Sequence, residues 1–144
     1  MIPLDSDNPV VQLCAEGMLV DGEPDKALVL FEQAWAARRD DFDASIAAHF
    51  VARHQPTPSA ALEWNERALK HALALDGDRA APLLPSLHLN VAESYRTTGR
   101  PDQAEAHAQV GLRALEHLSG DDGYYQFVKA GLDRLLLRLG APAT

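Results

Sequence analysis

The sequence has few cysteines and few aromatic residues. Cys14 is the only cysteine among 144 residues, so no disulfide can form within the chain. A single thiol in an apolar pattern is typical of a reducing compartment, and we expect Cys14 to be buried in a small-residue packing position. Aromatic residues reach 6%, whereas alanine and leucine supply much of the 47% hydrophobic fraction. This balance favours helices over strands.

Long hydrophobic runs are also missing. No stretch approaches the roughly 20 apolar residues that a membrane-spanning helix needs. The first seven residues, Met-Ile-Pro-Leu-Asp-Ser-Asp, contain no basic region followed by an apolar run, so no signal peptide is predicted. We therefore expect a cytoplasmic protein that does not associate with membranes.

Positive charge is scarce. The 13 Lys and Arg residues stand against 21 Asp and Glu residues, a net charge of −8. A nucleic-acid partner is not expected, because binding phosphates needs a basic face. Residues 1–43 hold ten acidic and three basic residues, a net of −7, and the remainder holds eleven and ten, a net of −1. This acidic first third is either an ordinary solvated surface or an attraction for a basic segment of a partner.

Arginine outnumbers lysine ten to three, as in proteins from GC-rich bacterial genomes.

The usual motifs of catalysis and metal binding are absent from the sequence. It has no glycine-rich phosphate loop, no nucleophile elbow, no His-Glu-x-x-His and no Cys-x-x-Cys. None of the six histidines stands three or four residues from another, the spacing that places two imidazoles on one helical face. We expect neither an enzyme nor a bound metal or cofactor. His49 and His88 are the alternative, because they could approach each other from two helices.

A short motif occurs twice. Residues 22–27 read Gly-Glu-Pro-Asp-Lys-Ala, and residues 99–104 read Gly-Arg-Pro-Asp-Gln-Ala. Glycine ends a helix because it tolerates the left-handed conformation, and proline opens the next helix because its missing N–H costs nothing in the first turn. Each copy therefore predicts a tight corner between two helices.

A third, weaker corner lies between these two. Pro56 follows Gly22 by 34 residues, with Thr57 as the predicted N-cap and Pro58 as the first helical residue. The three corners share a frame of small residues, five and twelve positions further along: Ala27 and Ala34, Ala61 and Ala68, Ala104 and Gly111.

This frame predicts about seven helices in one domain that spans residues 1–144. Their approximate ranges are 8–20, 24–38, 42–53, 58–75, 82–97, 102–118 and 123–139. We expect the Asp76-Gly-Asp78 segment to break the chain and Asp40, Asp41 and Asp43 to form a helical N-terminal turn.

The pattern resembles the tetratricopeptide repeat (TPR). The third copy is the most similar, with Ala92, Tyr95, Gly99, Ala104 and Ala108 at the expected positions. The repeats cover about 8–41, 42–84 and 85–118, and a capping helix covers about 121–139. The second repeat is nine residues longer than the usual 34, and no copy has the early tryptophan of the family. The resemblance implies an all-α, right-handed superhelix of antiparallel helix pairs.

The resemblance also implies a function. In this family the first helix of each pair lines a concave groove that binds a protein or peptide. The residues at those positions are Gln12, Glu16, Leu19, Ile46, Phe50, Arg53, Leu89, Asn90, Glu93 and Arg96. Phe50 is the predicted apolar anchor, and Asn90 matches the groove asparagine that hydrogen-bonds a ligand backbone. The predicted function is a protein-binding scaffold or adaptor, whose partner could carry a basic segment.

The last predicted helix carries the alternative function. Its apolar stripe is Tyr124, Phe127, Val128, Leu132, Leu135, Leu136 and Leu139, which we expect to cap the array. Tyr125 and Leu137 lie off this stripe. They are either singly exposed apolar residues or part of a self-association surface, which would make the chain a structural homodimer with no ligand in its groove.

Overall fold

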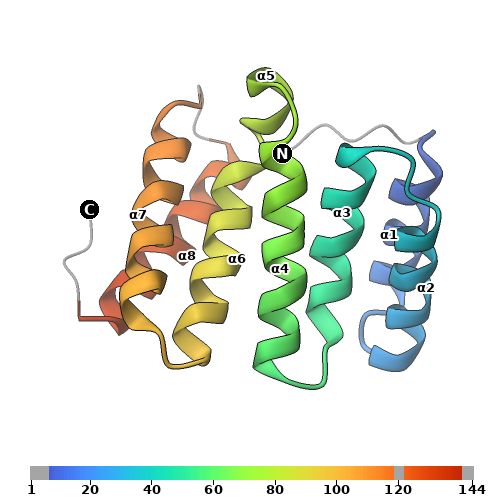
Figure 1. Cartoon of the computed structure of the whole chain (residues 1–144), viewed down its shortest axis with the longest axis horizontal. Helices are drawn as coiled ribbons and strands as arrows, with labels where there is room; N and C mark the ends of the chain where they lie inside the picture. Colours follow the sequence, from blue (N-terminus) through green and yellow to red (C-terminus); the bar gives the residue numbers. More distant parts are fainter. Residues whose placement is uncertain (1–6, 119–121, 141–144) are drawn as a thin grey trace. The chain divides into compact units, whose positions relative to one another are not determined.

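The computed structural model describes residues 7–118 and 122–140, and every regular element in these ranges is helical. The helices are α1 (Pro9–Leu19), α2 (Pro24–Ala36), α3 (Asp41–Val51), the 3-10 turn η1 (Ala52–His54), α4 (Pro58–Leu73), α5 (Gly77–Ala80), α6 (Leu84–Thr97), α7 (Pro101–Glu116) and α8 (Gly123–Arg138) (Figure 1). The all-α class is confirmed. The expected number of seven helices is wrong, because the described residues hold eight α-helices.

The additional helix is α5, a single turn in the segment predicted to be a break. Asp76 accepts a hydrogen bond from the Arg79 N–H at 3.1 Å and so caps this turn. α4 ends at Leu73 and does not extend through residue 75 as expected. The segment that was predicted to break the chain therefore starts a short helix. The carboxylate of Asp76 accepts a hydrogen bond from a first-turn N–H that has no partner within the helix.

The predicted helix starts are confirmed at three prolines. Pro24, Pro58 and Pro101 each occupy the first position of a helix. Thr57 is the N-cap of α4 and accepts a hydrogen bond from the Ala60 N–H at 3.1 Å. Asp40 likewise caps α3 by accepting from Asp43 N–H at 2.9 Å, as the acidic turn at residues 40–43 predicted.

The two glycines of the repeated motif behave differently. Gly99 has φ 77, and the Arg100 N–H donates to Tyr95 O at 2.8 Å, so α6 ends in the predicted left-handed turn. The same prediction is wrong for Gly22, because Gly99 and Gly140 are the only glycines with positive φ in the described chain. After α1 the backbone instead makes successive turn hydrogen bonds, including Glu23 N–H to Val20 O at 2.8 Å, which need no left-handed residue.

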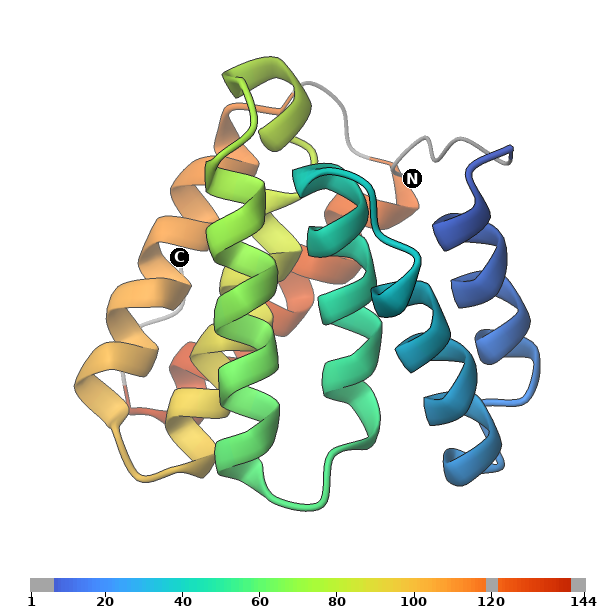
Figure 2. The same ribbon diagram turned by 45° about the vertical axis from the view of Figure 1, so that its right-hand side comes forward.

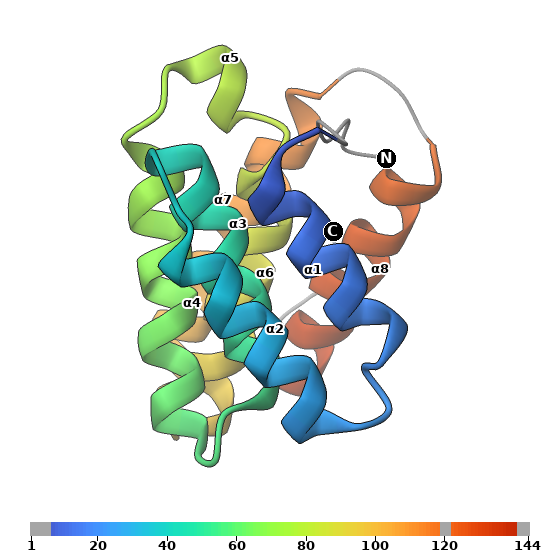
Figure 3. The same cartoon turned by 90° about the vertical axis from the view of Figure 1, so that its right-hand side faces the viewer.

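The chain divides into two compact units. The described part of the first unit covers residues 7–75, and its elements are α1 to α4 with η1. α1 packs side by side with α2, and α3 packs with α4, each pair joined by a short turn (Figures 2 and 3). α3 also contacts both α1 and α2. Phe31 and Cys14 are buried in this unit, which confirms the expectation for the thiol.

The described part of the second unit covers residues 76–118 and 122–140, and its helices are α5 to α8. α6 and α7 form the closest pair, and α8 packs against both. A core cluster of this unit contains Ala92, Ala108, Leu112, Leu115, Val128, Leu132, Leu135 and Leu136.

α8 corrects part of the predicted apolar stripe. Phe127 is 74% exposed, whereas Tyr125 is half-buried and packs against the core. At about 100° per residue, Phe127 lies about 140° around the helix from the buried Leu132, and Tyr125 lies only about 20° away. The prediction was wrong for these two residues because it considered the number of residues between stripe positions and not the angle between them around the helix axis. Leu137, predicted to be off the stripe, is 63% exposed.

Gly17 shows how closely α1 approaches α2, and it provides a stability test. A Cβ atom at this position would lie 2.3 Å from the ring of the buried Phe31. We predict that Gly17→Ala lowers the free energy of unfolding by about 1–3 kcal/mol, because the overpacking outweighs the better helix propensity of alanine. Urea unfolding followed by circular dichroism measures the change. Gly22→Ala is the matched control, since a Cβ at that position would have nothing within 4 Å, and it should be neutral or slightly stabilising. A Gly17→Ala midpoint equal to that of the parent would contradict this close approach.

Candidate partner-binding site

The predicted groove residues of α1 share one accessible face. Gln12, Glu16 and Leu19 follow each other at spacings of four and three, and all three are exposed. Leu19 is 87% exposed, a large apolar side chain on an acidic part of the chain. This face therefore offers both an apolar and a negatively charged contact.

The predicted residues of α3 are more enclosed. Ile46 is only 7% exposed, so most of its side chain belongs to the core. Phe50, the predicted anchor, is half-buried, and its ring centroid lies 5.3 Å from Phe31 and 5.0 Å from His49. Phe50 thus has a structural role within the first unit and presents only part of its ring to a partner.

Arg53, the last predicted residue of the first unit, takes part in an ion-pair cluster. Its Nη2 lies 2.6 Å from Asp21 Oδ2, and His54 Nε2 lies 2.7 Å from Asp21 Oδ1. The hydrogen bonds from Arg53 and then His54 lower the pKa of the Asp21 carboxyl to about 2. This cluster ties the turn after α1 to η1, and it neutralises much of the charge of Arg53.

The four predicted residues of α6 belong to the second unit. Leu89 is half-buried and packs against that unit's core, and its Cδ2 lies 2.8 Å from a Cβ built on Gly131 of α8. Glu93 and Arg96 form an ion pair with each other, with Arg96 Nε 3.1 Å from Glu93 Oε2. Asn90 is half-buried. Whether the residues of α6 share one groove with those of α1 and α3 stays a prediction.

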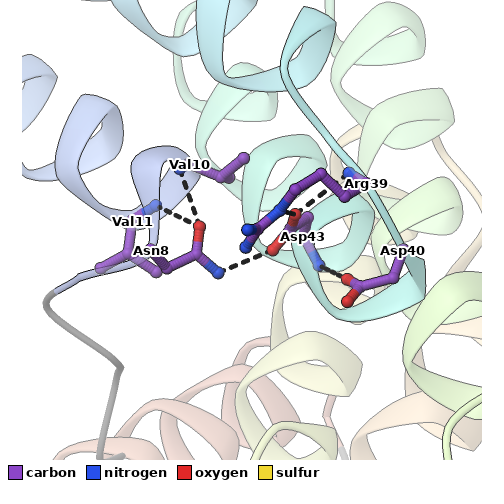
Figure 4. A network of polar contacts seen from close by, with 6 residues as sticks. All are labelled: Asn8, Val10, Val11, Arg39, Asp40 and Asp43. Carbon is purple, nitrogen blue, oxygen red and sulfur yellow. Dashed lines mark hydrogen bonds and ion pairs between the residues drawn. The ribbon is translucent and has the colours of Figure 1, made fainter.

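A buried network holds α1 against α3 (Figure 4). Asp43 is 1% exposed, and its Oδ1 accepts a hydrogen bond from Asn8 Nδ2 at 2.7 Å. Its Oδ2 accepts from the backbone N–H and from Nε of Arg39, at 3.0 and 2.9 Å. Burial would raise the pKa of the Asp43 carboxyl, but the hydrogen bonds from Arg39 and Asn8 outweigh it, and the pKa lies below its usual value. Asp43 thus stays charged and holds the start of α1 against α3.

Two histidines that sequence spacing did not pair meet in the second unit. His88 Nδ1 of α6 lies 3.1 Å from His107 Nδ1 of α7, and the ring of Tyr95 stacks on His107 at 5.4 Å. One Nδ1 must donate and the other accept, so the pair requires at least one neutral ring. Burial, together with the nearby charge of His107, lowers the pKa of His88 to about 4. The pair was missed because its members stand 19 residues apart.

Sequence reasoning also missed a tryptophan pair on the first unit. The rings of Trp35 in α2 and Trp64 in α4 meet edge to face, with centroids 5.0 Å apart. The guanidinium carbon of Arg38 lies 3.9 Å from the Trp35 ring centroid, and that of Arg67 lies 4.4 Å from the Trp64 centroid. A signal was present in the sequence, because each of the chain's two tryptophans is followed three residues later by an arginine.

A surface pocket lies at the same end of α2. Its volume is about 560 Å³, and it is lined by Ala36, Arg38, Arg39, Asp40, Asp41, Ala44 and His71. Charged groups of this lining already have partners within the unit. His71 Nδ1 lies 2.8 Å from Asp41 Oδ1, and Arg38 Nη1 donates to Trp35 O at 2.8 Å. His71 also contacts Trp35, with ring centroids 6.1 Å apart.

The described residues contain no group of three or more His, Cys, Asp or Glu side chains placed to hold a metal ion. None of the described helices combines the length and apolarity needed to cross a bilayer. Comparisons of the chain with protein-family models, curated proteins and solved structures give no significant match.

The lowered pKa of His88 makes stability depend on pH. His88 is neutral in the folded chain down to about pH 4, whereas in the unfolded chain it gains a proton near pH 6.5. Protons then bind the unfolded state preferentially, so the free energy of unfolding should fall as the pH drops from 7 to 5. We predict a contribution of roughly 1–2 kcal/mol from His88 over this interval.

The measurement is urea unfolding at pH 7 and pH 5 for the parent and for His88→Asn, whose side-chain amide can still hydrogen-bond but does not titrate. The variant should lose less stability than the parent on acidification. An equal loss in both proteins would show that His88 is protonated in the folded chain.

Proposed function

We propose that this chain is a TPR-like, protein-binding scaffold that acts in the cytoplasm. In this proposal the helix pairs form a right-handed superhelix, and the first helix of each pair faces the partner. The proposal is supported by the packing of α1 with α2 and of α6 with α7, and by the proline-initiated second helix of each pair. Such pairs bury one face against their neighbours and leave another face for binding.

The observation that carries the proposal is the exposed face of α1. Leu19, 87% exposed, lies on this face with Gln12 and Glu16. An exposed apolar side chain beside polar groups is a common composition for the contact region of a protein interface. The acidic residues in and around α1 favour a partner segment with basic side chains, which would be drawn to this face by charge and held there by apolar contact.

Binding through this face should be sensitive to Leu19, Glu16 and Phe50. After a pull-down identifies the partner, its affinity is measured by calorimetry for Leu19→Ala, Glu16→Gln and Phe50→Ala. We predict losses of roughly 1 kcal/mol or more for Leu19→Ala and roughly 2 kcal/mol for Phe50→Ala, and a smaller, salt-dependent loss for Glu16→Gln.

Val29→Ala is the matched control, since Val29 is 54% exposed on α2. Circular dichroism must show that Phe50→Ala remains folded, because its ring also packs on Phe31. Val29→Ala should bind like the parent, and if Leu19→Ala, Glu16→Gln and Phe50→Ala also do so, the α1 face is not the binding surface.

A second candidate function, self-association, is favoured by α8. Phe127 and Leu137 are 74% and 63% exposed, and they lie on the face opposite the core together with Ala130 and Arg134. In an antiparallel pair of α8 helices centred near Leu132, Phe127 of one copy would face Leu137 of the other, and Ala130 would face Arg134. Such reciprocal contacts are what a two-fold dimer requires.

Self-association through α8 is tested by changing the two apolar residues. We predict that the parent chain is a dimer in light-scattering measurements at micromolar concentration and that Phe127→Asp with Leu137→Asp makes it monomeric with unchanged helicity. Leu73→Asp is the matched control, since Leu73 is 59% exposed on α4 in the other unit. A parent chain that stays monomeric at all concentrations would reject this second function.

A further inference from the structure

Trp35, Trp64, Arg38 and Arg67 form a surface that we call the tryptophan–arginine patch. Both indole rings are only half-buried, and both arginines are exposed. The rings meet at an interplanar angle of 89°, and each is covered by the arginine of its own helix or its C-terminal turn. Four side chains from α2, the turn that follows it, and α4 thus form one continuous aromatic and cationic surface.

Contacts within the chain restrict the side chains of the patch in the absence of a partner. Arg38 donates from Nη1 to Trp35 O at 2.8 Å, and stacking on the indole restricts its guanidinium plane. A stacked guanidinium still presents N–H groups at its edge, where a carboxylate can accept two hydrogen bonds. Arginine and tryptophan are also enriched at the energetic centres of protein interfaces. Little conformational entropy remains to be lost when such residues bind.

The charges of the first unit are separated in a way that suggests the partner. Residues 3–75 carry twelve acidic and six basic residues. Two of the bases, Lys26 and Arg53, pair with Glu23 and Asp21. By contrast, among the described residues no ion pair engages Arg38, Arg67 or Lys70, the last of which lies one turn after Arg67 on α4. Three of the six basic residues of this acidic unit therefore lie at the patch or within one turn of it.

Several acidic residues lie near the patch without removing this charge. Asp40 caps α3, and Asp41 pairs with His71. Asp43 is buried and binds Arg39, so it does not reach the surface of the patch. Glu63 stands one turn before Arg67 on α4 and Glu66 one turn before Lys70, so both lower the positive charge at that edge of the patch.

We propose that the tryptophan–arginine patch is a docking surface for an acidic segment of another protein. Carboxylates of the segment bind the edges of Arg38 and Arg67, and an apolar side chain between them packs on the two indoles. The adjacent pocket of about 560 Å³ has room for a further side chain. The patch is separate from the α1 face. It would bind a negatively charged segment, whereas the α1 face would bind a positively charged one, so this proposal extends the proposed function and does not depend on it.

The two tryptophans of the patch are the only ones in the chain, so intrinsic tryptophan fluorescence reports on this surface directly. The probe is a synthetic peptide in which Glu or Asp alternates with Leu or Phe, and its counterpart replaces every acidic residue with lysine. Neither peptide contains tryptophan. We expect the acidic peptide to shift the tryptophan emission in a saturable, salt-sensitive way and the lysine peptide to leave it unchanged.

Variants of the arginines assign the effect to the patch. Arg38→Gln and Arg67→Gln keep both tryptophans, and each should weaken binding of the acidic peptide about tenfold. Arg113→Gln, an exposed arginine of α7, should bind like the parent, as should Glu16→Gln and Leu19→Ala on the α1 face. The proposal is overturned if neither peptide changes the fluorescence, if both peptides change it equally, or if the arginine variants bind the acidic peptide like the parent. None of these outcomes bears on binding at the α1 face, which is read from the α1 variants alone.

Discussion

The buried carboxylate of Asp43 is the interaction on which the arrangement of the first unit depends. A charge with 1% exposure is tolerable only if it is fully partnered, and its partners come from two other places in the chain: Asn8 at the start of α1 and Arg39 in the loop before α3. Asn8 also caps α1 by accepting from the Val10 N–H at 2.8 Å. One carboxylate thus sets where α1 begins, how the α2–α3 loop closes and how α1 lies against α3.

Close packing then determines which side chains remain outside. Gly17 lets α1 approach the ring of Phe31, and Gly131 lets α8 approach Leu89. Large apolar side chains that lie off these inner faces remain in contact with solvent, as Leu19 does on α1 and Phe127 on α8. Exposed apolar side chains are costly to leave in water, and the contacts proposed for them here offset that cost.

The first unit offers two surfaces of different chemistry. The α1 face combines Leu19 with the acidic Glu16, whereas the tryptophan–arginine patch combines aromatic rings with Arg38 and Arg67. A scaffold with both surfaces would bind a basic segment at one and an acidic segment at the other, so charge would direct each partner to its own surface. The helices themselves would stay unchanged, as expected of a preorganised binding surface.

The sequence by itself determined the local features of this protein. Conformational preferences and hydrogen bonds within a few residues determine these features. They are the all-helical class, the helix starts at Pro24, Pro58 and Pro101, the cap at Thr57 and the turn at Gly99. The predicted groove residues were only partly foreseeable: Leu19 is exposed as a ligand-binding position should be, but Ile46 and Leu89 turn inward. Only the tertiary structure decided this burial, the pairing of His88 with His107, and the contact of Trp35 with Trp64. These contacts join residues from different helices, and their formation depends on the angle and distance at which the helices pack, which spacing along one helix does not specify.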